Sequence, residues 1–237
     1  QKGADYGMIA NSEIGKEWYE QANAFAAYVV GKTLDEVLAI EVDEEGSAVS
    51  EDILAGTTVT VTDYIAVIEA AYNNATVEVE AASVGTSAIT HVTVPNAQAT
   101  AEAAGRIDVN TYIANVALDK DGKIVSAYID VAQSSRLGFD ATGLATIDET
   151  YDARTKQQKG ADYGMIANSE IGKEWFEQAN AFAAYVVGKT AEEVLAIELD
   201  EEGSAVSEDI LAGTTVTVSD YIAVIAAAAA NATAIAK

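Results

Sequence analysis

The chain has 237 residues, half of them apolar, and a formal net charge of −25. This length fits one large or two ordinary domains with a buried core. No apolar run is long enough to span a membrane, and the acidic charge disfavours nucleic acid and anionic lipid as partners. The chain has no cysteine and one histidine, which excludes disulfides and the zinc sites built on several Cys and His ligands.

A long internal repeat dominates the sequence. Gln1–Ala75 recurs almost unchanged as Gln158–Ala232, at a constant offset of 157 positions and without a gap. The segment between the copies occurs once, so the repeating unit is longer than the copied stretch. The predicted organisation is a helical half of a first, incomplete unit at 1–75, connecting strands at 76–105, and a complete second unit at 106–237, with its sheet half at 106–157 and its helical half at 158–237.

Each copy predicts several helices in chain order. Apolar residues from Ile14 to Val29 recur at helical spacing behind Ser12, and Gly31 is expected to end that helix. Thr33 and Glu36 form a capping-box pattern for a short second helix. A last helix is expected to begin near position 62, where Thr62, or Ser219 in the second copy, can cap it.

The unrepeated segment predicts strands. Alternating or β-branched runs occupy 76–80, 89–94, 106–118 and 123–131, and Pro95 closes the first pair. The Asp-Gly step at Asp121 and Gly122 predicts a hairpin. The expected fold class is therefore α+β, with repeated units that each pack a twisted antiparallel β-hairpin or sheet against helices. The first copy lacks its own hairpin, so an earlier segment, residues 76–94 or another chain must supply its strands.

The main candidate site is an Ala-Gly-Thr-Thr segment that lies before the last helix of each copy. Its glycine permits close approach to a ligand, and its hydroxyls together with the helix N-terminus can accept an anion such as phosphate. The alternative is a β-branched strand that leads into a helix cap. The candidate residues are Gly56, Thr57, Thr58 and Thr60 in the first copy, and Gly213, Thr214, Thr215 and Thr217 in the second.

These residues resemble motifs of the FMN-binding domain family, as found in membrane-associated electron-transfer subunits and in secreted lipoproteins of anaerobic Gram-positive bacteria. That family pairs a D-G-K-I-like hairpin turn with a later D-x-x-S-G-A-T-x-T segment followed by a helix. The chain has the turn at 121–124 and the later segment at 209–217. The resemblance implies FMN as a cofactor, attached by a phosphoester bond to the threonine that falls on Thr58 and Thr215.

The chain departs from the family pattern at three places. The serine before the glycine is Ala55 or Ala212, and the alanine after it is Thr57 or Thr214. Only a trace of the family's E-T-P-G-L-G loop remains, at 136–139. The chain also resembles secreted lipoproteins that carry G-x-D-Y-G-M and G-K-E-W segments.

Other motifs favour structural roles. Tyr6 and Tyr163 suit either a ring-stacking platform or the edge of the core, and Trp18 is expected in the core. Glu17 forms no acid–base pair, because no histidine or second carboxylate is positioned beside it. His91 is expected to be structural, and the acidic residues of the 119–122 turn are too few for a calcium site. We therefore predict no catalytic set and no metal site.

Three functions remain open from the sequence. The first is an extracytoplasmic tandem-repeat protein with FMN-binding-like domains that carries flavin for electron transfer, with an unidentified redox partner. The alternative is a cell-surface or self-assembling structural protein that forms a homo-oligomer or head-to-tail filament without a cofactor. A secreted small-molecule-binding lipoprotein is a third interpretation. The sequence does not decide whether the protein is an enzyme.

Overall fold

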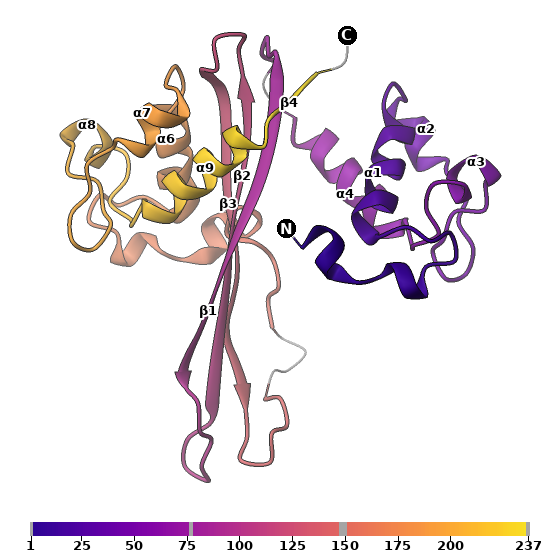
Figure 1. The fold of residues 1–237 in the computed structure, drawn as a ribbon. Helices are drawn as coiled ribbons and strands as arrows, with labels where there is room; N and C mark the ends of the chain where they lie inside the picture. The colour runs from indigo at the N-terminus through magenta and orange to yellow at the C-terminus, as the bar shows by residue number, and fades with distance from the viewer. Residues whose placement is uncertain (1, 76–77, 147–150, 236–237) are drawn as a thin grey trace. The chain divides into compact units, whose positions relative to one another are not determined.

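A computed structural model describes residues 2–75, 78–146 and 151–235. The chain divides into two compact units, Gln1–Glu78 and Val79–Lys237. The first unit is built from helices, and the second combines helices with an antiparallel sheet (Figure 1). The predicted α+β class is confirmed.

The helices of the first unit follow local signals in the sequence. Their bounds are η1 Gly3–Tyr6, η2 Ile9–Asn11, α1 Trp18–Val29, α2 Leu34–Leu38, α3 Glu51–Leu54 and α4 Thr62–Asn73. The predicted capping box of Thr33 and Glu36 is present, and Gly31 follows the C-cap of α1 with φ of 82°. The helix α1 begins at Trp18 rather than at Ile14, because Glu17 and Glu20 form a capping box there.

The second unit repeats these helices and adds one. Their bounds are α5 Lys156–Lys159, η3 Gly160–Tyr163, η4 Ile166–Asn168, α6 Trp175–Tyr185, α7 Ala191–Leu195, α8 Glu208–Leu211 and α9 Ser219–Ala230. The first residues of the last helix do not act as the expected caps. Val61 and Val218 occupy the N-cap positions, and the Thr62 hydroxyl instead donates to the carbonyl of Gly46 at 3.2 Å.

The sheet belongs entirely to the second unit. It consists of β1 Ser83–Asn96, β2 Gly105–Leu118, β3 Ile124–Phe139 and β4 Thr233–Ala234, in the order β3-β2-β1-β4 with antiparallel neighbours. The predicted hairpin joins β2 to β3. Its turn is closed by Asp119, whose carboxylate accepts the amides of Asp121 and Lys123 at 2.9 Å each. These amides hold the pKa of Asp119 below its ordinary value, and Lys123 contributes most.

Helices α6 and α9 pack on one face of this sheet. The helix α9 lies along β1 and β2, and α6 lies against β3 near the same end of the strands (Figure 1). Fully buried side chains fill the contact, among them Ala114, Ile129, Val131, Phe182, Val224 and Ile225. Burial of each large apolar side chain stabilises the fold by about 1.5–3 kcal/mol.

Two expectations about residues 76–105 are corrected. These residues are not merely connecting strands, because β1 lies between β2 and β4 in the sheet of the second unit. Glu78, Val79 and Glu80 are exposed and lie outside any strand, so the described part of the expected strand at 76–80 is wrong, while residues 76–77 lie outside the described residues. The alternative in which residues 76–94 supply a sheet to the first unit is also wrong, because β1 pairs with β2.

The two copies of the helical half differ in burial. Trp18 is 41% exposed, whereas its equivalent Trp175 is 2% exposed. Val67 is 67% exposed, whereas Val224 is fully buried. The described residues of the first unit contain no strand, so the difference follows from the sheet that covers one copy only.

Among the helices of the described ranges, none is both long and apolar enough to cross a membrane.

Gly85 is required where β1 passes beneath α9. A Cβ at this position would overlap the backbone carbonyl of Ala228. We expect Gly85→Ala to destabilise the second unit by about 1–3 kcal/mol, since backbone must shift to make room. Thr86→Ala is the control, because Thr86 is exposed and points to the opposite face. Guanidinium unfolding measures both, and equal midpoints for the two variants would contradict this packing.

Candidate functional site

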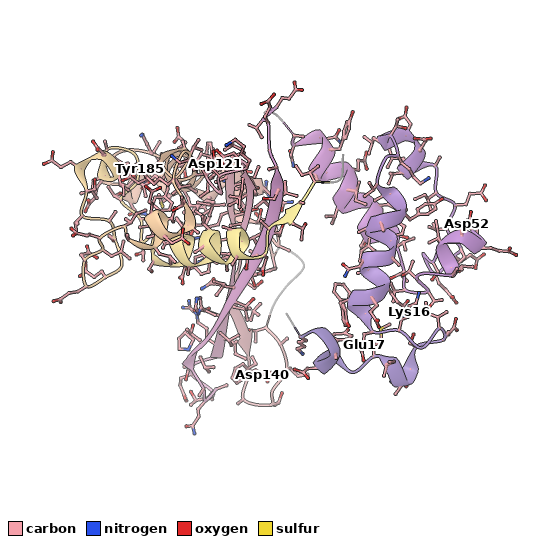
Figure 2. The ribbon with its side chains drawn as sticks, turned by 45° about the horizontal axis from the view of Figure 1, so that its top comes forward. Lys16, Glu17, Asp52, Asp121, Asp140 and Tyr185 are labelled. Carbon is pink, nitrogen blue, oxygen red and sulfur yellow. The ribbon has the colours of Figure 1, made fainter. Side chains whose placement is uncertain are left out.

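The Ala-Gly-Thr-Thr segment lies between the short helix α8 and the long helix α9, and equivalently between α3 and α4. It is an irregular segment rather than the β-branched strand considered as an alternative. In the first unit it follows Asp52, and the Lys16 ammonium donates to the Ala55 carbonyl at 3.3 Å (Figure 2). Lys173 and Ala212 make the same contact at 3.4 Å.

A buried glutamine holds this segment in both copies. The Gln178 side-chain oxygen accepts the backbone amide of Thr215 at 2.8 Å, and its nitrogen donates to the Ser169 hydroxyl at 3.0 Å. Gln21 makes the same bonds to Thr58 and Ser12 at 2.8 and 3.0 Å. Both glutamines are fully buried. Each therefore joins the start of its helical half to the candidate segment 37 residues later.

The glycine and the first threonine of the segment pack against a helix. A Cβ on Gly213 would lie 2.9 Å from the Ala181 Cβ, and a Cβ on Gly56 would lie equally close to that of Ala24. Thr214 is buried, and its hydroxyl donates to the Gln178 carbonyl. The glycine therefore permits close approach of a helix, where the sequence suggested close approach of a ligand.

The remaining hydroxyls lie nearer the surface. Thr58 and Thr215 are half-buried, each with its hydroxyl 3.3 Å from the glutamine oxygen, and Thr60 and Thr217 are exposed. The helix that follows begins at position 62 or 219, after two further residues. The segment therefore presents two accessible hydroxyls per copy.

The two motifs of the family resemblance contact different parts of α6. Thr215 bonds to Gln178 in the first turn of that helix. The hairpin residue Ile124 instead bonds to Lys189 and Gly188, beyond the end of the helix, at 2.9 and 2.7 Å. The structure therefore brings Gly213, Thr214 and Thr215 together on α6 without joining them to the hairpin turn.

The repeated Gly-Lys-Glu-Trp segment has a role that the sequence did not reveal. The Glu174 carboxylate accepts the backbone amides of Met165 and Ile166 at 2.8 and 3.2 Å. Glu17 accepts those of Met8 and Ile9 at 2.9 and 3.2 Å (Figure 2). These buried carboxylates fasten the preceding 3₁₀ turns to the helix, so both belong to the structure of the helical half.

Four of the aspartates are engaged in tight turns. Four Asp-x-x-Gly turns share one geometry, in which the aspartate accepts the amides two and four residues later; they begin at Asp43, Asp119, Asp140 and Asp200. The described residues contain no group of three or more acidic or histidine side chains placed to hold a metal.

His91 lies on β1 and contacts α9. Its Nε2 lies 2.9 Å from the Asp220 carboxylate, and its ring meets Tyr112 edge-on. Burial, together with the negative charge of Asp220, raises the pKa of Tyr112 to about 12. These contacts join the sheet to the first turn of α9, in agreement with the structural role expected for His91.

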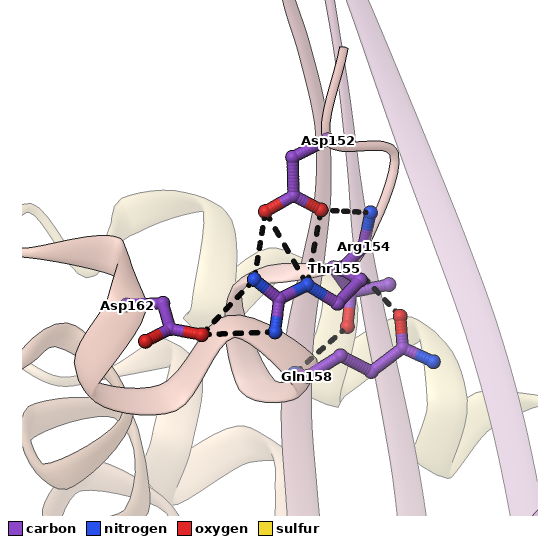
Figure 3. A network of polar contacts seen from close by, with 5 residues as sticks. All are labelled: Asp152, Arg154, Thr155, Gln158 and Asp162. Carbon is purple, nitrogen blue, oxygen red and sulfur yellow. Dashed lines mark hydrogen bonds and ion pairs between the residues drawn. The ribbon is translucent and has the colours of Figure 1, made fainter. Parts of the chain in front are cut away.

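Lys156 is a further residue that the sequence did not single out. It lies on α5, with its ammonium 4.9 Å from the centre of the Tyr163 ring and 5.2 Å from that of Trp175. Thr155 and Gln158 form the capping box of α5, and Arg154 bonds to Asp152 and Asp162 beside it (Figure 3). Burial lowers the pKa of Lys156 to about 8, although Asp130 opposes this shift.

The first copy has a cavity at the corresponding place. Its volume is about 920 Å³, and its lining includes Lys2, Tyr6, Trp18, Ala22 and Asn23. Tyr6 and Trp18 lie 6.3 Å apart between ring centres. Of the two alternatives given for these tyrosines, Tyr163 fits the edge of the core, where it packs edge-on against Trp175, whereas Tyr6 is exposed.

Comparisons with known proteins identify no family. No family model matches the chain, and no solved structure is significantly similar to it. A stretch of 44 residues is 46% identical to a chlorophenol reductase from Desulfitobacterium hafniense, covering 19% of this chain and 14% of that protein. The chain thus spans only a small part of that relative.

Replacing the buried glutamine should weaken each unit separately. We expect Gln178→Ala to destabilise the second unit by about 2–4 kcal/mol, because it leaves several buried polar groups without partners. Gln21→Ala should act likewise on the first unit. Trp175 and Trp18 report the two units by fluorescence during guanidinium unfolding. Unchanged midpoints in both variants would contradict the bridging role.

Burial of Lys156 predicts a dependence of stability on alkaline pH. Its folded pKa of about 8 lies below its ordinary 10.5, so between pH 8 and 10 the unfolded chain holds the proton that the folded chain has lost. Stability should therefore rise across this window. Urea unfolding should show a smaller rise for Lys156→Met than for the control Lys123→Met, whose lysine is exposed. Equal slopes would contradict the buried position of Lys156.

Proposed function

We propose that the chain is an extracytoplasmic tandem-repeat scaffold, in which each complete unit consists of a helical half packed on a sheet half. The observation that carries this proposal is the contrast between two nearly identical helical halves. One packs its apolar face on a sheet, and the other leaves the same face exposed. An exposed apolar face of this kind marks a site of association with other polypeptide.

The candidate segment supports a structural role in this proposal. Its glycine, its first threonine and a backbone amide are all used in packing or hydrogen bonding to α6. The glycine and amide contacts recur in the first unit at Gly56 and Thr58, whereas the Thr57 hydroxyl has no hydrogen-bond partner among the described residues. The acidic turns likewise use their carboxylates internally, and the high negative charge keeps such a scaffold soluble.

Flavin carriage is the second candidate function. The observation that favours it is the position of Thr58 and Thr215, whose hydroxyls are half-buried and bonded only at 3.3 Å. These are the two threonines to which the family resemblance assigns the phosphoester bond. Gly56, Thr57, Thr60 and their equivalents Gly213, Thr214 and Thr217 would line such a site, and an electron-transfer partner would then be required.

Native material distinguishes the two functions. For the scaffold we expect native material to have the intact mass of the polypeptide and no visible absorption. We expect the isolated 237-residue chain, in which Trp18 and Val67 are exposed, to self-associate reversibly in sedimentation experiments. Val67→Asp should weaken the association, and the control Val79→Asp, outside this face, should not. A mass raised by one FMN per occupied threonine, or a protein that stays monomeric at all concentrations, would overturn the scaffold proposal.

A further inference from the structure

The apolar surface of the first helical half has an equivalent in the second copy that is covered by a sheet. We call this surface the first-copy face; Tyr6, Trp18 and Val67 on it are exposed, and Ala22, Tyr64, Ile65 and Ile68 are half-buried. The second-copy equivalents are buried or half-buried against β1, β2 and β3. They retain the same residue types at every one of these positions. The side chains that pack against the sheet in the second copy are therefore also present in the first copy.

The cavity on the first-copy face corresponds to a place that is occupied in the second unit. There the Lys156 ammonium lies over Trp175 at 5.2 Å, and the Gln157 side-chain nitrogen donates to the Asn180 side chain at 2.9 Å. Gln157 also bonds to the Ile129 carbonyl of β3 at 2.9 Å. The cavity is lined by Trp18 and Asn23, the equivalents of Trp175 and Asn180. Its lining offers the aromatic ring and the amide that a lysine and a glutamine located after a strand contact in the second unit.

The second unit shows which end of the helical half lies beside this occupant. Gln157 is joined by one peptide bond to Gln158, the residue equivalent to Gln1. A lysine and glutamine that fill the first cavity in the same way must therefore lie next to Gln1. The first-copy face thus suits a sheet half whose last residues precede the helical half directly.

The sheet of the described residues cannot serve both helical halves. Its inner face is already covered by α6 and α9, and an exchange between two chains would leave as many faces exposed as before. The opposite face mixes hydrogen-bonded polar pairs, Thr86 with Asn115 at 2.7 Å and Thr90 with Thr111 at 2.9 Å, with the exposed apolar residues Val84, Val92 and Tyr128. The pattern that covers α6 and α9 in the second unit belongs to the inner face.

We infer that the first-copy face is the seat of a second sheet half, of the kind formed by residues 79–157, whose last residues dock beside Gln1. The inference rests on the proposed scaffold function and names its partner. The first helical half then gains the same cover as the second. Several substitutions distinguish the two seats. Among them, Tyr72 replaces Ala229, which packs at the edge of the second core, and Glu69 replaces the half-buried Ala226.

The test adds a copy of residues 79–157 ahead of the full chain, which recreates the junction of Gln157 with Gln158 at Gln1. The added segment contains no tryptophan, so Trp18 and Trp175 remain the only two. We expect the Trp18 emission to shift to the blue and the population accessible to acrylamide to be lost. A Trp18→Phe background identifies the signal, because Trp175 is already buried in the unextended chain.

The control carries aspartate in the added segment at the position that repeats Ile129, a fully buried residue of the inner face. In this control Trp18 should stay accessible. The extended chain is also measured with Tyr72→Ala, which restores the alanine found at position 229 of the second copy. If Trp18 stays as accessible as in the unextended chain in both backgrounds, the inference is overturned, whether or not the added segment folds. This outcome is separate from failure of the scaffold function, which flavin mass or the absence of association would reveal.

Discussion

The fold depends on one constraint, which is that the helical half cannot bury its own apolar face. Its longest helices have 12 residues, and helices of this length are marginal without tertiary packing. In the second unit the sheet provides that packing through residues such as Ile129 and Val131. In the first unit the core is limited to a small cluster around Phe25, Ile53 and Val61. The same sequence therefore gives a covered core in one place and an open face in the other.

Polar contacts explain how the first unit keeps the shape of the second without its sheet. Glu17 and Gln21 make the same hydrogen bonds as Glu174 and Gln178, within 0.1 Å at each contact to Met8, Thr58 and their equivalents. These bonds lie within the helical half. They join the 3₁₀ turns at its beginning, its long helix and the Ala-Gly-Thr-Thr segment, and they need no contact with a sheet. The polar network thus defines the shape, and the apolar face is left for docking.

Features that depend on residues close together in the sequence could be predicted. The capping box of Thr33 and Glu36 lies within four residues, and the hairpin at Asp121 and Gly122 follows from the conformation that glycine allows. The role of Gln178 could not be predicted, because its partner Thr215 lies 37 residues away. The pairing of β1 with β2 could not be predicted either. It depends on a register between residues far apart in the sequence and not on the composition of residues 76–105.

The departures from the flavin-binding pattern match the surroundings of the residues concerned. Where the family has a serine before the glycine, the chain has Ala212, which is exposed. Where the family has an alanine after it, the chain has Thr214, which is buried and bonds to the Gln178 carbonyl. Compared with that pattern, the chain lacks a hydroxyl on the side that meets solvent and has one on the side that meets the helix. The first difference weakens an anion site, and in the second copy the other strengthens internal hydrogen bonding. Ala55 and Thr57 repeat both differences in the first copy, where the buried Thr57 hydroxyl has no hydrogen-bond partner among the described residues. The second copy therefore supports the scaffold over the flavin carrier.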